Sequence, residues 1–126
     1  MSGKRRNHLL FLEDILEALS RIEEYTSQID LHKLQENQMI IDAVVRNFEV
    51  IGEAVKNIPR AVRGKYPDIE WKEAAGFRDV LIHEYFGIDI EAVRDTIAKN
   101  LPPFKRKIRK VLRDEKKELK SVKRRR

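Results

Sequence analysis

The chain has 126 residues, of which 41% are hydrophobic and 38% are charged, and it contains no cysteine. This length suits one compact domain with a core of its own. The missing cysteines exclude disulfides, cysteine-based zinc sites and cysteine nucleophiles. No uncharged apolar run approaches the roughly 18 residues of a membrane span, and the first residues do not resemble a signal peptide. We therefore expect a soluble, cytoplasmic domain with no membrane contact.

The net charge of +6 is concentrated at one end of the chain. Residues 102–126 hold 13 of the 27 Lys and Arg residues but three of the 21 acidic ones, which leaves 14 against 18 in residues 1–101. Such a run can neutralise phosphates, or it can be a solvated helix end. We divide the chain into a helical bundle over 1–113 and a basic C-terminal tail over 114–126, whose role stays open.

Apolar residues recur every three or four positions and predict helices in chain order. The first helix is expected over about 8–27, where one apolar stripe runs from Leu9 to Tyr25. Asp30 is a candidate N-cap for the second, which extends from Leu31 or the mid-30s to Ile58, and Pro59 ends it.

A polar connector over 59–67 precedes the third predicted helix, for which Asp68 is the candidate N-cap. This helix is expected to run through Ile82 and to stop near Phe86, before Gly87. Asp89 should cap a further helix over 90–101, and Pro102-Pro103 predicts a break before a last helix. The fold class predicted is therefore all-α, a four- to five-helix up-and-down bundle with no strands.

Signatures of cofactor and metal sites are missing from the sequence. Neither glycine-rich phosphate-binding pattern occurs, and the three histidines, at positions 8, 32 and 83, lie in separate segments. His83-Glu84 lacks the second histidine of a H-E-x-x-H zinc site. We therefore expect no cofactor and no metal.

The candidate chemistry lies in residues 76–86. Arg78 can grip phosphate oxygens and stabilise charge that develops on them. His83 can move a proton near neutral pH, and Asp79, one helical turn earlier, can orient its imidazole. On a helix Arg78 and His83 would lie about 140° apart, so convergence needs the reach of Arg78, a distorted helix end or a second protomer.

A second protomer would also supply a second His83. Cleavage of RNA by its own 2′-hydroxyl needs a base and an acid, and one chain offers a single well-placed histidine. The chemistry of the residues thus favours a homodimer.

Arg78-x4-His83-x-Tyr85 resembles the R-x4-6-H motif of HEPN domains, in the HepT-like form that adds H-x-Y. Residues 43–54 resemble the second-helix signature of that family, and residues 66–71 and 75–79 resemble its connector and third helix. The likeness covers about residues 9–112.

This resemblance implies a HEPN-like bundle that acts as the toxin of a type VII-like toxin–antitoxin pair, a metal-independent, homodimeric RNA endonuclease. Its implied catalytic residues are Arg78 and His83. From the residues themselves we expect Asp79 to support His83, and we expect Arg46 to have a supporting or interface role, either by adding positive charge to the cleft or by pairing with a nearby carboxylate. Its implied partners are an RNA substrate and a minimal nucleotidyltransferase antitoxin, which would transfer AMP to Tyr85 and so block the catalytic pair.

Two other functions stay open. A HEPN module without catalysis could use Arg78 and His83 to bind a nucleotide or a partner, because a fold alone does not fix a function. A small DNA-binding protein could use residues 105–126 instead, although no short helix-turn-helix pairing is apparent.

Overall fold

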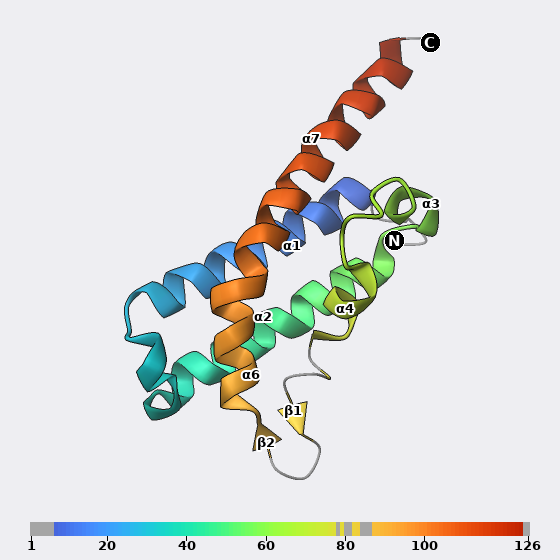
Figure 1. Ribbon diagram of the computed structural model, residues 1–126. Coiled ribbons are helices and arrows are strands. Elements are labelled where there is room, and N and C mark those ends of the chain that lie inside the picture. Colours follow the sequence, from blue (N-terminus) through green and yellow to red (C-terminus); the bar gives the residue numbers. More distant parts are fainter. Residues whose placement is uncertain (1–6, 78, 80–81, 84–86, 125–126) are drawn as a thin grey trace, which may run out of the picture.

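The structure, a computed structural model, describes residues 7–77, 79, 82–83 and 87–124. Two long helices, α1 (His8–Ser27) and α2 (Gln38–Asn57), lie side by side in opposite directions, joined by the 3-10 helix η1 (Leu31–Glu36). The third long helix, α7 (Leu101–Arg124), packs across α1, and its C-terminal part extends beyond the rest of the bundle (Figure 1). The all-α bundle expected from the sequence is confirmed.

Short polar side chains begin the helices of the first half. The Asn7 side chain accepts a hydrogen bond from the backbone N–H of Leu9, and Asn37 accepts one from Ile40 at the start of α2. Asp30 is a cap as expected, but it caps η1 through the N–H of His32. The second helix is therefore divided in two, because Asn37 provides a new N-cap within the expected run.

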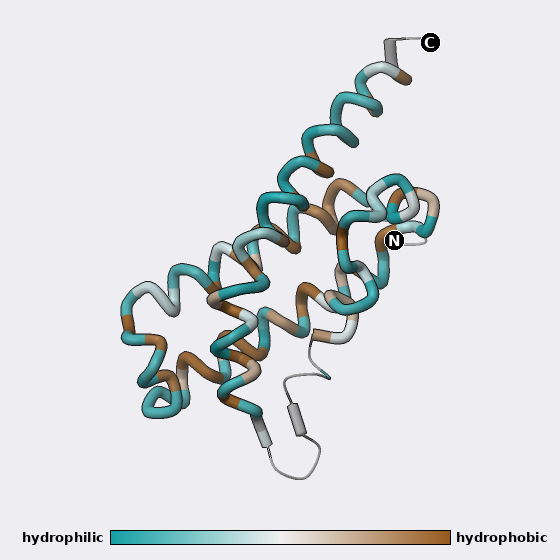
Figure 2. The backbone as a smooth tube through the Cα atoms, in the orientation of Figure 1, coloured by the Kyte–Doolittle hydropathy of each residue, from teal (hydrophilic) through white to brown (hydrophobic). Residues whose placement is uncertain are grey.

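The core is formed by the apolar stripes of the three long helices, which Figure 2 shows as brown segments facing the inside of the bundle. The stripes predicted for the first two helices are confirmed. The largest fully buried side chains of the core are Phe48, Leu12, Ile15, Leu19, Ile22, Leu34, Ile51, Ile58, Ile108, Val44 and Val55.

The connector after α2 folds into α3 (Arg60–Arg63) and leads to α4 (Trp71–Ala75). Trp71 is buried, and its indole N–H donates to the carbonyls of Arg63 and Tyr66, both at 3.1 Å. The expectation that Asp68 caps this helix is wrong. Glu70 occupies the N-cap position without a side-chain bond, and the Asp68 backbone carbonyl instead accepts a 2.8 Å bond from Lys107 Nζ.

The third predicted helix is much shorter than expected. It ends at Ala75, Gly76 follows it, and Phe77 and Asp79 are again helical. The strand β1 (Ile82–His83) then pairs antiparallel with β2 (Gly87–Ile88), so the expectation of a helix through Ile82 and of no strands is wrong here. Gly76 weakens a helix, and Gly87, at a φ of 80°, adopts a conformation that suits a tight reversal rather than a helix.

The last segment is continuous, and the expected break at Pro102-Pro103 is wrong. Asp89 caps α6 (Ile90–Asp95) through the N–H of Ala92, as predicted, and the π-helical turn η2 (Thr96–Asn100) leads directly into α7. The two prolines occupy the first turn of α7, where the missing N–H groups cost least. The wider π turn before them relieves the clash that a proline ring makes with the preceding helical turn.

Within the described ranges, no helix is both long and apolar enough to cross a membrane. The boundary predicted at 113/114 lies inside α7, which continues through it to Arg124.

Candidate functional site

The candidate motif lies where helix gives way to the short strand pair. His83 pairs with Gly87, and Ile82 pairs with Ile88, so the chain reverses direction between positions 83 and 87. Gly87 has a φ of 80°, which a residue with a Cβ adopts only with strain. The strand pair therefore places the backbone of His83 opposite that of Gly87.

The side chains predicted to carry the chemistry are only partly covered by the structure. Asp79 has a helical backbone and is exposed. Arg78 and Tyr85 lie outside the described residues, and His83 is described for its backbone alone. The roles of all four therefore stay predictions.

The strand at His83 does change the geometry on which two of those predictions were argued. Asp79 and His83 do not lie one turn apart on a helix, because His83 is extended. The angle of about 140° between Arg78 and His83 on an ideal helix does not apply either, for the same reason. The strand at His83 shows that the motif does not continue as one helix to this residue.

Arg46, the other predicted supporting residue, is exposed on α2. It lines a hollow of about 200 Å³ together with Phe11 and Asp14 of α1 and other residues of α2. Gly52, in contrast, meets α4, since a Cβ built on it would lie 2.8 Å from the Ala75 carbonyl oxygen. Arg46 thus lies on the α1 side of α2, and its supporting or interface role stays a prediction.

A larger hollow lies beside Phe77, the residue that precedes Arg78 of the motif. It has a volume of about 330 Å³, and its lining comes from α4 and its N-cap residue, from Phe77, and from η2 and α7: Glu70, Glu73, Phe77, Thr96, Lys99, Asn100, Pro103, Phe104 and Lys107. Sequence reasoning did not find it, because no single segment of the chain contains its pattern.

Phe77, the residue before Arg78, is held between two other rings. Its ring meets Phe48 of α2 edge-on at 5.6 Å and Phe104 of α7 at 5.8 Å. Such pairs stabilise a packing beyond the area that they bury. These contacts hold the start of the motif against α2 and α7.

Among the described residues, no group of three or more His, Asp or Glu side chains could hold a metal ion. Near the motif, the larger hollow presents two cations, Lys99 and Lys107, which can contact phosphate oxygens, and two carboxylates, Glu70 and Glu73.

Comparison with known proteins decides the family. The family model "Ribonuclease HepT-like" matches residues 15–111. The chain is 44% identical over 110 residues to a Methanocaldococcus jannaschii protein named "Putative RNase MJ1216", which covers 87% of this chain and 91% of the relative. It is 41% identical over 107 residues to "Probable ribonuclease HepT" of Thermococcus cleftensis, covering 85% of this chain and 97% of the relative. The chain belongs to the HepT-like ribonuclease family.

A third HepT-like relative is bacterial. It is "Putative RNase TTE0752" of Caldanaerobacter subterraneus, 39% identical over 106 residues that cover 84% of this chain and 95% of the relative. No solved structure gives a significant match. The matched region includes the larger hollow and the strand pair, it leaves out Phe11 and Asp14 of the smaller hollow, and it ends four residues before Glu115.

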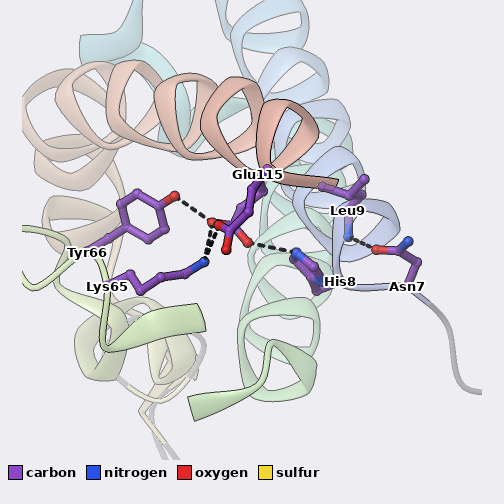
Figure 3. Close-up of polar contacts among 7 residues, drawn as sticks. Asn7, His8, Leu9, Lys65, Tyr66 and Glu115 are labelled. Carbon is purple, nitrogen blue, oxygen red and sulfur yellow. Dashed lines mark hydrogen bonds and ion pairs between the residues drawn. The ribbon is translucent and has the colours of Figure 1, made fainter. Parts of the chain in front are cut away.

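Glu115 forms the most connected polar cluster that the structure describes, and sequence reasoning missed it. Its carboxylate is 4% exposed and lies 3.0 Å from His8 Nε2, 2.8 Å from Lys65 Nζ and 2.6 Å from the Tyr66 hydroxyl (Figure 3). The signal was present in the sequence, because Glu115 continues the apolar spacing of Phe104, Ile108 and Val111. A carboxylate at such a position needs partners from elsewhere in the chain.

Electrostatics in this cluster favours the charged carboxylate. Burial raises the pKa of Glu115, but the hydrogen bonds from Lys65 and Tyr66, the charge of Lys65 and the His8 contact together lower this pKa below its ordinary value. The hydrogen bond to Glu115 raises the pKa of Lys65, and burial raises the pKa of Tyr66. The cluster fixes α7 against the start of α1 and the connector, and nothing in it points to catalysis.

Proposed function

We propose that this HepT-like protein is a metal-independent RNA endonuclease and the toxin of a type VII-like toxin–antitoxin pair. The observation that carries the proposal is the family match over residues 15–111, which contains the complete R-x4-H-x-Y motif at Arg78, His83 and Tyr85. The relatives that cover most of the chain bear the names of ribonucleases, which supports RNA as the substrate.

In the proposed reaction His83 removes the proton from a 2′-hydroxyl of RNA, and this oxygen attacks the adjacent phosphorus. Arg78 stabilises the charge that grows on the phosphate oxygens. The bond to the 5′-oxygen breaks, and His83 of a second protomer donates a proton to that leaving oxygen. The products are a 2′,3′-cyclic phosphate and a free 5′-hydroxyl, and no metal is required.

The homodimer is part of this proposal because each chain supplies one histidine to the motif. Asp79 is proposed to orient His83, and Arg46 is proposed to support the cleft or the dimer interface.

The proposed antitoxin is a minimal nucleotidyltransferase that adds AMP to Tyr85. Tyr85 lies two residues after His83 in the sequence. A bulky anion attached there would compete with the phosphate of the substrate for Arg78, and this would silence the nuclease.

Cleavage in EDTA tests the catalytic part. We expect the purified protein to cut RNA and to leave cyclic phosphate or 3′-phosphate ends, and we expect His83→Ala to abolish cutting and toxicity. His32→Ala is the matched control, because His32 is exposed on η1. A requirement for Mg²⁺, or full activity of His83→Ala, would refute the mechanism, and binding of RNA without products would favour a non-catalytic module.

Mass spectrometry tests the regulatory part. After co-expression with a minimal nucleotidyltransferase, the intact protein should gain the mass of AMP at Tyr85. Tyr85→Phe should lose the gain, whereas Tyr25→Phe, a change on α1, should keep it. An unchanged mass of the parent protein would contradict this pairing.

A further inference from the structure

The solvent-facing side of α7 is uniformly basic. Its buried stripe consists of Leu101, Phe104, Ile108, Val111 and Glu115. With about 100° between successive residues of a helix, the six positions between 104 and 120 that lie opposite this stripe, within about 60°, are all basic and all exposed: Arg106, Arg109, Lys110, Arg113, Lys117 and Lys120. We call these six residues the basic stripe.

The acidic residues of α7 lie outside this stripe. Glu115 is buried, Glu118 pairs with Lys65 at 2.7 Å, and Asp114 lies beside the stripe, 3.6 Å from Lys110. Within the described ranges, the other five members of the stripe make no ion pair. Their charges are therefore left to solvent or to a partner, and their mutual repulsion makes an anionic partner favourable.

The spacing of the stripe suits an extended polyanion. Residues three or four apart on a helix are about 5–6 Å from each other, and Arg106 and Lys120 lie about 21 Å apart along the axis at 1.5 Å per residue. A row of separate cations of this length can contact several successive phosphates of one nucleic-acid strand, and each contact releases counterions.

A membrane surface fits less well. Helices that lie on membranes expose an apolar face, whereas the apolar face of α7 is buried in the bundle. Val122 is the one large hydrophobic residue of described α7 that is clearly exposed, and Figure 2 shows the projecting part of the helix as mostly hydrophilic.

The stripe begins at the level of the candidate motif along the axis of α7. Phe104 faces the bundle and contacts Phe77, the residue before Arg78, and Arg106 lies about 3 Å further along the axis on the opposite, solvent-facing side. Lys107 and Lys99 line the hollow between these segments. A strand held along α7 therefore leads toward the motif at one end and beyond the bundle at the other (Figure 1).

We propose that the basic stripe of α7 is a track that binds the phosphate backbone of the RNA substrate and directs the strand to the motif. The identity of the polyanion as RNA rests on the proposed function. The track is a binding surface, and none of its residues is assigned to the chemical step.

The test uses the full chain and a labelled single-stranded 2′-O-methyl oligoribonucleotide, which lacks the free 2′-hydroxyl and is not cleaved. Its affinity is measured between about 50 and 200 mM salt, the range over which phosphate contacts are lost. The test variant is Arg113→Gln/Lys117→Gln/Lys120→Gln. The matched control, Lys33→Gln/Lys56→Gln/Arg60→Gln, removes three exposed charges from η1, α2 and α3.

For the test variant we expect at least a tenfold loss of affinity at low salt. The slope of log K against log salt should become shallower by about 2, because each lost contact to a single strand removes about 0.7. Glutamine has nearly the helix propensity of lysine and arginine, and circular dichroism checks that α7 persists. An unchanged slope, or an equal loss in the control, would overturn the track. So would stripe-dependent binding to phosphatidylserine vesicles without binding to the oligonucleotide.

A failure of the proposed track can be distinguished from a failure of the proposed function. If the parent protein fails to cut unmodified RNA yet binds the methylated strand through the stripe, the nuclease proposal fails and the track stands. If the parent protein cuts RNA and the test variant does so with an unchanged KM, the track fails and the nuclease proposal stands.

Discussion

Glu115 accepts a 2.6 Å hydrogen bond from the hydroxyl of Tyr66, which lies 49 positions earlier in the chain. Lys65 and His8 contact the same carboxylate, so a single side chain of α7 meets the connector and the start of α1. The contact joins α7 to two other parts of the fold (Figure 3). The direction in which the basic stripe projects is therefore set by a buried polar cluster as well as by apolar packing.

Replacing Glu115 with glutamine should destabilise the fold by about 1–3 kcal/mol, because the partners of this buried carboxylate lose a charged acceptor. Urea unfolding followed by circular dichroism measures the change. Glu118→Gln is the control, since Glu118 also contacts Lys65 but its side chain is 60% exposed. It should change stability by no more than about 0.5 kcal/mol. Equal stability of the two variants would contradict the importance of the buried cluster.

The same carboxylate should contribute to the acid sensitivity of the protein. The pKa of Glu115 is lowered in the folded state, so its contribution to stability is present above its unfolded pKa and is lost as the pH falls through the lower folded pKa. The stability difference between the parent protein and Glu115→Gln should therefore be largest near neutral pH and should shrink as the pH falls below about 4. Urea midpoints measured from pH 7 to pH 3 give this difference, and a difference independent of pH would refute the assignment.

The stability of the protein should also fall at alkaline pH, because of Tyr66. The pKa of Tyr66 is raised by burial and by its bond to Glu115. A raised pKa gives stability that is present below the unfolded pKa of about 10 and is lost as the pH rises further. Tyr66→Phe should remove this part of the alkaline loss. Spectrophotometric titration should also show one tyrosine that ionises later than the others, and normal titration of every tyrosine would contradict the prediction.

The long helices could be predicted from the sequence because their signal is local. Each carries an apolar stripe at helical spacing, as Leu12, Ile15 and Leu19 do on α1, and such a stripe needs no knowledge of its partner. Caps are equally local, so Asp30 and Asp89 were found correctly, although Asp30 begins a 3-10 helix.

The errors arise where distant residues decide the local structure. Residues 77–82 are compatible with a helix, but Ile82 and His83 pair with Ile88 and Gly87 instead, and this pairing cannot be read from periodicity. The Glu115 cluster likewise brings together positions 8, 65, 66 and 115. The motif was identified from its residue types. These types give its position in the sequence, but they do not predict the strand pair that includes His83.

The contact between α2 and α4 gives a further prediction. A Cβ on Gly52 would lie 2.8 Å from the Ala75 carbonyl oxygen. That oxygen belongs to the backbone of α4, which cannot easily move away from α2. Gly52→Ala should therefore cost about 1–3 kcal/mol and displace α4, which precedes the motif. The control is Gly76→Ala, whose Cβ would lie 3.7 Å from the nearest atom, an ordinary contact. Urea unfolding should show little change for the control, and an equally stable Gly52→Ala would contradict the tight approach.

Gly87 gives the last prediction, because its backbone and its surroundings can be separated. Among the residues that the structure describes, none lies within 4 Å of a Cβ built at this position, so we attribute the expected effect of Gly87→Ala to the φ of 80°. The expected cost is about 1–2 kcal/mol, the strain of a left-handed conformation. If the variant relaxes this strain by opening the strand pair, His83 loses its fixed position. The rate of RNA cleavage should then fall by more than the loss of folded protein accounts for. Gly87→Asn should restore much of both, since asparagine tolerates the left-handed region. Equal losses in the alanine and asparagine variants would show that the φ of Gly87 does not determine the geometry of the motif.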